Sequence, residues 1–165
     1  MSSPTPHITL FVYGTLKRGQ WNHDRFCRNA VDIRPATIVG RLYQLPAGFP
    51  AVVIPEETIL AHGTANPLAD ARTQAELAER GVAMPQAEGN WGVVHGELIT
   101  FPHPERDLPP IDRLEGFRPG WDGLYRRALV AVQADGDFGT VWVYLMPAIR
   151  RGRLCSSGCW DGDGS

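Results

Sequence analysis

Six segments of the chain carry the patterning of β-strands, with runs or alternations of branched and aromatic residues. In chain order they are "ITLFVYG" (8–14), "ATIVGRLYQL" (36–45), "PAVVI" (50–54), "WGVVHGELITF" (91–101), "YRRALVAVQ" (125–133) and "GTVWVYLM" (139–146). The dipeptide Asp135-Gly136 between the last two is a hairpin signal. The pattern therefore predicts a fold made mainly of strands.

Two segments carry helical signals. In "NPLADARTQAELAERG" (66–81), Asn66 is suited to cap the helix, Pro67 fits its first turn and Gly81 its end. Its apolar face is thin and mostly alanine, which predicts a position on the surface. The second helix is predicted within "LPPIDRLEGF" (108–117), with Pro110 in the first turn and Gly116 as the stop.

The order of these elements favours one architecture. The strands do not alternate with helices, which favours an α+β fold: a small barrel or highly curved sheet with a few helices attached. A chain of 165 residues is the size of one domain, so we expect residues 1–165 to form a single unit. The Gly- and Ser-rich tail from Cys155 to Ser165 predicts a loosely ordered end.

Composition argues against several partners. The formal net charge is −2, with 16 basic and 18 acidic residues, so no excess of positive charge favours nucleic acid or a membrane surface. The apolar runs are too short to cross a bilayer, and the first residues do not read as a signal peptide. We therefore expect a cytoplasmic protein, and oligomeric state is left open.

Metal and cofactor sites have weak support. Cys155 and Cys159 lie close enough in sequence to pair or to share a metal, but a second ligand pair at zinc spacing is missing, and two reduced thiols remain the alternative. The five histidines are scattered without ligand spacing. We predict no metal and no organic cofactor.

The loop after the first strand reads "GTLKRG" (14–19), which has the glycine spacing of a phosphate-binding loop but lacks its Lys-Ser/Thr pair. What remains is a glycine turn whose backbone N–H groups can face a small carboxylate or an oxyanion. The alternative is that Gly14 only permits a tight turn while Lys17 and Arg18 form a solvated rim.

Glu115 is placed unfavourably for stability alone. It falls in the last turn of a predicted helix, where unpaired carbonyls disfavour negative charge. Partial burial beside Leu114 and Phe117 is expected to raise its pKa toward neutrality, as a general acid or base requires. The alternatives are an exposed ion pair with Arg113, Arg118 or Arg126, and Asp112 as a rival carboxylate earlier in the helix.

Together, "FVYGTLKRGQWNH" near the N-terminus, "IDRLEGF" and then "YRRALVAV" resemble the γ-glutamylcyclotransferase-like family, which includes γ-glutamylaminecyclotransferases and the cyclotransferase of butirosin biosynthesis. The resemblance continues through "FPAVV", "GVVHGEL" and "VWVYLM", and reaches the small-residue turn "LCSSGCW". It implies a small β-barrel with flanking helices. It also implies that Tyr13, Gly14, Thr15 and Leu16 form a substrate loop, that Glu115 is the catalytic acid/base and that Tyr125 lines the pocket.

The implied reaction releases 5-oxoproline and a free amine or amino acid from a γ-glutamyl compound, without metal or cofactor. The implied partner is a small γ-glutamyl molecule, and the sequence leaves its amine undefined. Two alternatives stay open: a related amide hydrolase, and a non-catalytic module that binds a small carboxylate or a protein. Residues 56–90 read as an insertion between barrel strands that either tunes the leaving amine or is a surface elaboration.

Overall fold

The computed structural model describes residues 6–20, 22–86, 89, 91–117, 125–149 and 151–160. Their elements, in chain order, are β1 (Ile8–Val12), α1 (His23–Phe26), β2 (Asp32–Gln44), β3 (Pro50–Val53), the 3-10 turn η1 (Glu56–Thr58), β4 (Ala61–His62), α2 (Pro67–Arg80), β5 (Gly92–Phe101), α3 (Pro104–Glu115), β6 (Arg126–Ala134), β7 (Asp137–Leu145) and β8 (Arg153–Leu154). All six predicted strands are present.

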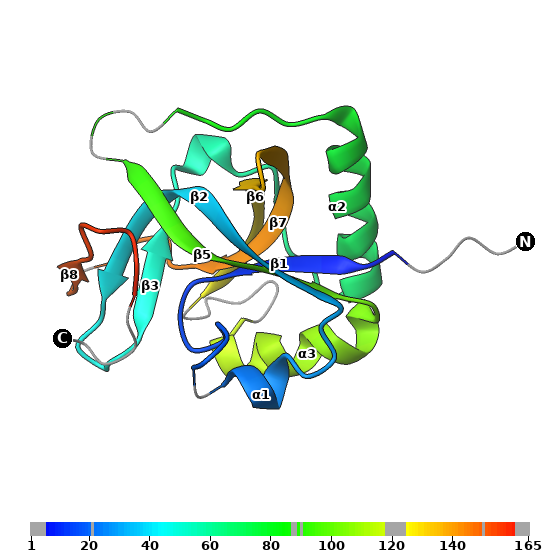
Figure 1. Cartoon of the computed structure of the whole chain (residues 1–165), viewed down its shortest axis with the longest axis horizontal. Coiled ribbons are helices and arrows are strands. Elements are labelled where there is room, and N and C mark those ends of the chain that lie inside the picture. Colours follow the sequence, from blue (N-terminus) through cyan, green and yellow to red (C-terminus); the bar gives the residue numbers. More distant parts are fainter. Residues whose placement is uncertain are drawn as a thin grey trace, which may run out of the picture.

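Within the described residues, five strands close a mixed barrel in the order β2-β5-β1-β7-β6 (Figure 1). The barrel closes where β6 pairs again with β2, at Thr37 opposite Gln133. Most neighbours are antiparallel, but β1 and β7 are parallel and share only the register pair Leu10 and Trp142. The short strands β3, β4 and β8 extend the barrel at its edges. The predicted α+β barrel with flanking helices is confirmed.

The apolar residues form two clusters on the two faces of the barrel wall. Alternate residues of β1, β6 and β7, such as Phe11, Val130 and Val143, fill the interior. The residues between them, such as Leu10 and Trp142, face outward and pack with the helices. Because β6 and β7 are covered on both faces, their sequences are nearly continuous apolar runs.

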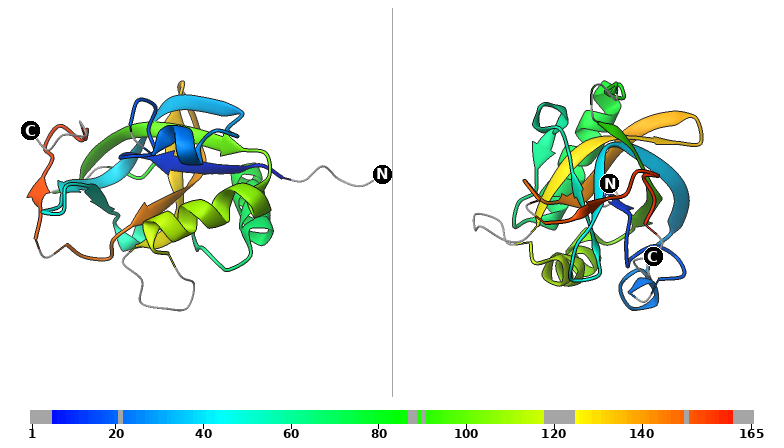
Figure 2. Two further views of the ribbon diagram at one scale, coloured as in Figure 1. Left: turned by 90° about the horizontal axis from the view of Figure 1, so that it is seen from below. Right: turned by 90° about the vertical axis from the view of Figure 1, so that its left-hand side faces the viewer.

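Helix α2 has the predicted caps but a different role from the one expected. The Asn66 side chain accepts a hydrogen bond from the backbone N–H of Ala69 at 3.0 Å, and Gly81 ends the helix with a φ of 81°. The helix does not simply lie on the surface. It packs along the barrel (Figure 2), and its residues Asp70, Ala71 and Gln74 are buried. Two of these three buried residues are polar, so the apolar pattern of the helix did not indicate that this face packs against the barrel.

Gln74 bridges β1 and β7, the two neighbouring barrel strands that share a single register pair. Its side-chain oxygen accepts from the backbone N–H of Thr9 in β1 at 3.0 Å, and its amide nitrogen donates to the carbonyl of Thr140 in β7 at 2.7 Å. The Thr140 hydroxyl donates back to the Gln74 carbonyl at 3.2 Å. A side-chain amide thus supplies hydrogen bonds between two strands that pair with each other at only one position.

Two elements begin earlier than predicted, and both run through proline. Helix α3 begins at Pro104, six residues before Pro110, and contains both Pro109 and Pro110 in its interior. It remains helical because Leu108 and Ile111 are fully buried against the barrel, and Gly116 ends it in the left-handed region as predicted. Strand β2 likewise begins before the predicted start and runs through Pro35.

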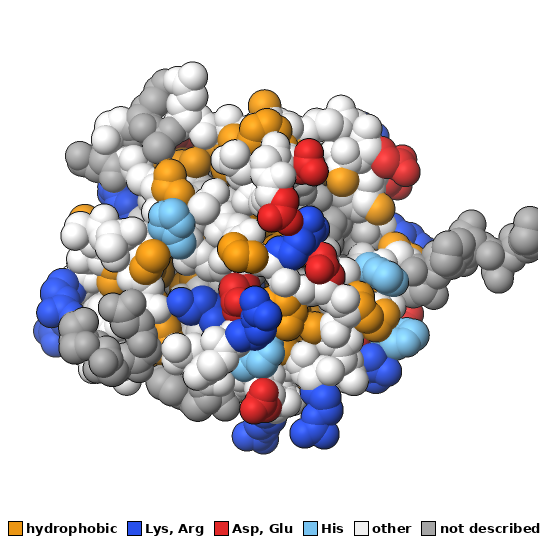
Figure 3. Space-filling model, in the orientation of Figure 1, with side chains coloured by type: hydrophobic (Ala, Val, Ile, Leu, Met, Phe, Trp, Pro, Cys, Tyr) orange, Lys and Arg blue, Asp and Glu red, His pale blue; other side chains and the backbone are white. Residues whose placement is uncertain are grey.

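The predicted insertion, residues 56–90, supplies η1, β4 and α2 in its described part. The tail is described to Trp160, which is buried, and residues 161–165 lie outside the described part. No helix of the described residues is both long and apolar enough to cross a membrane. The face in Figure 3 shows acidic and basic side chains interspersed, with no large patch of one sign.

Candidate active site

A cavity of about 340 Å³ opens where the loop after β1 meets the end of α3. It is lined by Phe11, Val12, Tyr13, Gly14, Thr15, Leu16, Asn22, Phe49, Pro50, Leu114, Glu115, Gly116, Tyr125 and Tyr144. The structure therefore brings all six predicted site residues to one cavity. It adds residues that the sequence analysis missed, chiefly Asn22, the Phe49-Pro50 pair and Tyr144.

The loop that was predicted to bind substrate, residues 13–16, turns the carbonyl groups of its last three residues into the protein. The carbonyl of Gly14 accepts from the N–H of Lys17, that of Thr15 from the N–H of Asn22, and that of Leu16 from the His23 ring. In the part of the chain that the structure describes, no hydrogen bond uses the N–H groups of Gly14, Thr15 or Leu16. The loop thus has three backbone donors available at a wall of the cavity, as a carboxylate or oxyanion requires.

Gly14 is required by close packing and not by a left-handed backbone conformation. A Cβ at this position would lie 2.6 Å from Cγ of Pro50, a ring atom that cannot swing aside. The absence of a side chain lets the loop approach β3, which closes the cavity on that side.

The basic residues behind the loop anchor it to the C-terminal tail and to β5. Lys17 donates to the carbonyl of Trp160 at 2.8 Å, and Arg18 pairs with Glu97 at 3.2 Å while its backbone N–H donates to the same carboxylate. The expected solvated rim is therefore only partly correct, because both side chains have protein partners. The Asn22 amide also donates to the Thr15 hydroxyl at 2.9 Å, which fixes the loop from inside.

Glu115 forms part of the cavity wall, and its carboxylate has no partner among the described residues. Among the described residues, no hydrogen bond or ion pair reaches its carboxylate, and neither Arg113 nor Arg126 pairs with it. Arg118, the third suggested partner, lies outside the described residues. Burial first, and then the negative charge of Asp112, raise the pKa of Glu115 to about 7. The exposed ion pair offered as an alternative is not what the described residues form.

Three tyrosines surround the carboxylate, and each already donates its hydroxyl proton to the protein. Tyr13 donates to the carbonyl of Tyr144 at 2.6 Å, Tyr125 to that of Pro50 at 2.9 Å, and Tyr144 to the Asp112 carboxylate at 2.5 Å. Burial raises the pKa of all three phenols above their ordinary range, with a further contribution from the charge of Glu115. They are neutral walls of fixed orientation, and their oxygens can still accept a hydrogen bond.

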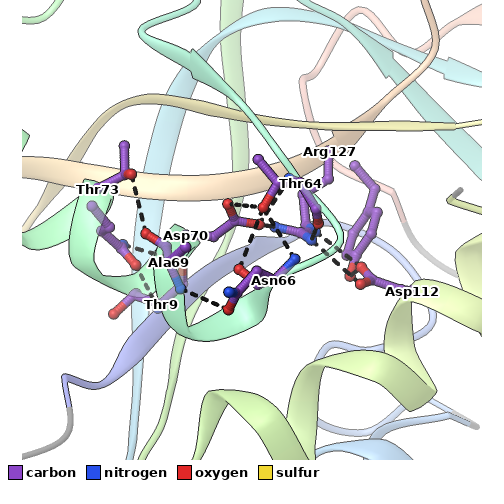
Figure 4. A network of polar contacts seen from close by, with 10 residues as sticks. Thr9, Thr64, Asn66, Ala69, Asp70, Thr73, Asp112 and Arg127 are labelled. Carbon is purple, nitrogen blue, oxygen red and sulfur yellow. Dashed lines mark hydrogen bonds and ion pairs between the residues drawn. The ribbon is translucent and has the colours of Figure 1, made fainter. Parts of the chain in front are cut away.

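Asp112, the rival carboxylate, is committed to a different interaction. Arg127 donates from Nε to one of its oxygens at 2.9 Å, and the same Arg127 pairs with Asp70 of α2 at 2.8 Å (Figure 4). Burial raises the pKa of Asp112, and Arg127 and the Tyr144 hydroxyl oppose that rise. Asp112 is therefore a paired structural carboxylate. Among the described residues that line the cavity, Glu115 is the carboxylate open to a ligand.

No metal centre is visible in the residues described: no three His, Cys, Asp or Glu side chains of these segments converge. Cys27, Cys155 and Cys159 are not joined in disulfides, and burial raises the pKa of Cys27 to about 12. Cys155 and Cys159 thus do not form the disulfide that their spacing allowed.

Solved structures of similar fold come from distant organisms. YkqA from Bacillus subtilis matches with a TM-score of 0.56 and 21% identity over 93% of this chain, which spans only 39% of YkqA. The uncharacterized protein PH0828 from Pyrococcus horikoshii matches with a TM-score of 0.51 and 16% identity, over 93% of this chain and 90% of its own. The Arabidopsis thaliana protein At3g28950.1 matches with a TM-score of 0.51 and 20% identity, over 98% of this chain and 73% of its own. At these identities the likeness concerns the fold.

The sequence itself gives the family. No protein with a curated description matches significantly. The family model described as "Gamma-glutamyl cyclotransferase, AIG2-like" matches residues 10–80 and 67–162, and these ranges include both the loop of residues 13–16 and Glu115. With nearly the whole chain matched, the protein belongs to the AIG2-like γ-glutamyl cyclotransferase family.

Proposed function

We propose that the protein is a γ-glutamyl cyclotransferase that converts a small γ-glutamyl amine or γ-glutamyl amino acid into 5-oxoproline and the free amine. The observation that carries the proposal is one cavity lined both by a carboxyl of pKa about 7 and by a loop of backbone N–H donors, neither of which has a hydrogen-bond partner among the described residues. Family membership supports the same class of reaction. The cytoplasm, predicted from the sequence, is the proposed compartment.

The first step assigns Glu115 the role of general base. A γ-glutamyl compound carries an α-ammonium group, which must lose a proton before its nitrogen can attack. An ordinary glutamate is a weak acceptor for that proton, and a pKa near 7 makes the transfer less unfavourable at neutral pH. The tyrosine oxygens around Glu115 are available to accept hydrogen bonds from the same ammonium group.

The second step is ring closure. The freed α-nitrogen attacks the γ-carbonyl carbon to form the C–N bond of a five-membered ring, and holding the chain bent supplies much of the rate. The N–H groups of Gly14, Thr15 and Leu16 are assigned to the anionic parts of the substrate. Protonated Glu115 then gives its proton to the departing nitrogen as the original amide bond breaks. The regenerated carboxylate takes the second proton of the attacking nitrogen, which becomes the lactam N–H, and passes it to the released amine, which leaves as an ammonium ion. Water is not consumed, and the scheme uses no metal or cofactor.

The test is release of 5-oxoproline from a panel of γ-glutamyl amines and γ-glutamyl amino acids, with wild-type protein, Glu115→Gln and the control Glu76→Gln. Glu76 is an exposed carboxylate on α2 and lines no part of the cavity. We expect release from at least one substrate, a loss of at least 100-fold in Glu115→Gln, consistent with the contribution of general acid–base catalysis, and no loss in Glu76→Gln.

Other products would overturn the proposal in distinct ways. Free glutamate in place of 5-oxoproline would show hydrolysis by water. Binding of 5-oxoproline or a γ-glutamyl amine with no turnover of any panel member would show a binding module of the same fold. Full activity in Glu115→Gln would remove Glu115 from the mechanism.

A further inference from the structure

A fully buried arginine links α2 to the helix that carries Glu115. Arg127 lies on β6 with its side chain completely excluded from solvent. Its Nη1 donates to Asp70 of α2 at 2.8 Å, and its Nε and Nη2 donate to the two oxygens of Asp112 of α3 at 2.9 and 3.4 Å. We refer to Asp70, Arg127 and Asp112 as the ion-pair bridge (Figure 4).

The bridge is closely fitted at its α2 end. Asp70 also accepts hydrogen bonds from the backbone N–H and the hydroxyl of Thr64, at 2.9 and 2.8 Å. Arg127 donates to the Thr64 carbonyl at 3.1 Å. A Cβ on Gly63 would lie 2.9 Å from the Arg127 carbonyl and 3.0 Å from its Nη1, so the chain needs a glycine there to pass the guanidinium. The segment before α2 is thus built around Arg127.

The guanidinium also contacts the residue that follows the helix. Its central carbon lies 4.7 Å from the ring centroid of Phe117, and Trp142 lies on it from the barrel side at 5.3 Å. Asp112 is three residues before Glu115 and Phe117 is two after it, so one arginine holds the chain on both sides of the carboxylate.

Glu115 has little else to define its position. Its carboxylate has no hydrogen-bond partner within the described residues, and its helix lacks two backbone donors at Pro109 and Pro110. The backbone N–H groups of Gly116 and Phe117 close the helix end on the carbonyls of Arg113 and Asp112. The orientation of the last turn therefore depends on the contacts that Arg127 makes with Asp112 and Phe117.

Stability alone does not explain why the protein buries an ion-pair bridge of this kind. Burying an arginine and two carboxylates costs several kcal/mol per ion before their attraction is counted, and apolar replacements of similar volume often serve stability equally well. Fixed geometry is what a planar, multiply bonded guanidinium supplies and an apolar contact does not.

We propose that Arg127 is a positioning residue for Glu115, and that α2 serves the site by holding Arg127 through Asp70. The inference rests on the proposed role of Glu115. It gives the segment 56–90 a task that differs from tuning the leaving amine: none of its described residues lines the cavity, and it acts on the site through Arg127, behind the cavity wall.

The decisive variant is Arg127→Lys, which keeps the charge but cannot hold Asp70 and Asp112 with one planar group. We expect kcat to fall roughly 10- to 100-fold with little change in KM, as a misplaced catalytic group predicts. Asp70→Asn is the second variant, because it keeps Arg127 but weakens the interaction that holds it. Its kcat is also expected to fall.

The matched control is Asn66→Ala, which removes the N-cap of α2 without touching the ion-pair bridge. It weakens the same helix, so a loss caused only by lower stability appears in it too. We expect its kcat to equal that of wild type. Circular dichroism and thermal unfolding confirm that each variant is folded at the assay temperature.

A readout independent of turnover separates this inference from the proposed function. The titration of Glu115 is followed by carbon NMR of labelled glutamate carboxyls, with Glu115→Gln to assign the signal. The ionisable groups facing Glu115 are Asp112 of its own helix, Tyr13 after β1, Tyr125 before β6 and Tyr144 of β7. None of them is altered in the variants.

With a loosened last turn, water reaches Glu115 and its pKa falls from about 7 toward the ordinary value in Arg127→Lys and Asp70→Asn, but not in Asn66→Ala. If wild type releases no 5-oxoproline, the proposed function fails and the titration still tests the bridge. Folded Arg127→Lys and Asp70→Asn proteins with wild-type kcat and wild-type titration of Glu115 overturn the inference.

Discussion

Replacing Glu115 by glutamine is expected to stabilise the protein at alkaline pH and not at acidic pH. The pKa of this carboxyl is about 7 in the folded chain, against an ordinary value of 4.5. At about 1.4 kcal/mol for each pKa unit, ionising Glu115 in the folded state costs about 3 kcal/mol more than in the unfolded state. The site therefore carries a stability cost that comes from the property proposed for its function.

The sign follows from proton binding. Between about pH 4.5 and pH 7 the folded state holds a proton on Glu115 that the unfolded state has lost, so wild-type stability falls as pH rises through this window. Glutamine is never ionised and escapes the cost. The free energy of unfolding of Glu115→Gln, minus that of wild type, is expected to increase by roughly 2 to 3 kcal/mol from pH 5 to pH 8.

Urea unfolding followed by tryptophan fluorescence measures this difference, because Trp142 and Trp160 are both buried. Glu76→Gln, which changes an exposed carboxylate, is the control and is expected to show no such increase. A difference between Glu115→Gln and wild type that stays constant within about 0.5 kcal/mol from pH 5 to pH 8 would refute the reasoning, because it would mean that Glu115 titrates alike in both states.

Two further substitutions test the packing around the site. Gly14→Ala places a Cβ 2.6 Å from Pro50 Cγ, so we expect a loss of about 1 to 3 kcal/mol in urea unfolding, as overpacking costs, together with weaker 5-oxoproline release; unchanged stability and activity would show that the loop yields freely. Gln74→Leu removes the side-chain bridge between β1 and β7, so hydrogen exchange at the Thr9 amide is expected to accelerate by at least tenfold, and unaltered exchange would show that the seam does not depend on it.

The strands and the helix caps could be read from local sequence. Asp135 and Gly136 adopt φ values of 52° and 81°, as a two-residue hairpin turn requires, and Gly116 is left-handed where a helix stop was predicted. These features depend on one or two residues with restricted backbone choices. For that reason they were predictable without knowledge of the partners.

The starts of β2 and α3 were predicted too late, and both elements run through proline. A proline breaks a helix or a ladder when nothing opposes it, but tertiary packing overrides a local preference of a few kcal/mol. Leu108 and Ile111 are both fully buried, and that contact extends α3 back to Pro104 across two prolines. Burial of this kind depends on the barrel surface, which local patterning does not contain.

The candidate site likewise has residues that local sequence indicates and one, Arg127, whose partners are distant in sequence. Glu115 and the substrate loop stood out because a carboxylate at a helix end and a glycine after a strand are both locally unusual. Arg127 was missed, although a signal existed: on β6 it shares a face with Leu129, two residues on, which is fully buried. An arginine in phase with buried residues of a strand predicts a buried ion pair, but its partner Asp70 lies 57 residues away and could not be identified from the pattern.

The two buried polar side chains of α2 give this helix two separate connections to the barrel. Gln74 fastens β1 to β7 at the seam where the strands share a single register pair, and β1 leads directly into the substrate loop. Asp70 fastens Arg127, which holds the end of α3. The two halves of the proposed site, backbone donors and carboxylate, therefore depend on the same helix although it contributes nothing to the cavity wall that the structure describes. It follows that substitutions in α2 should affect catalysis only where they alter these two polar contacts, while its exposed positions should tolerate change.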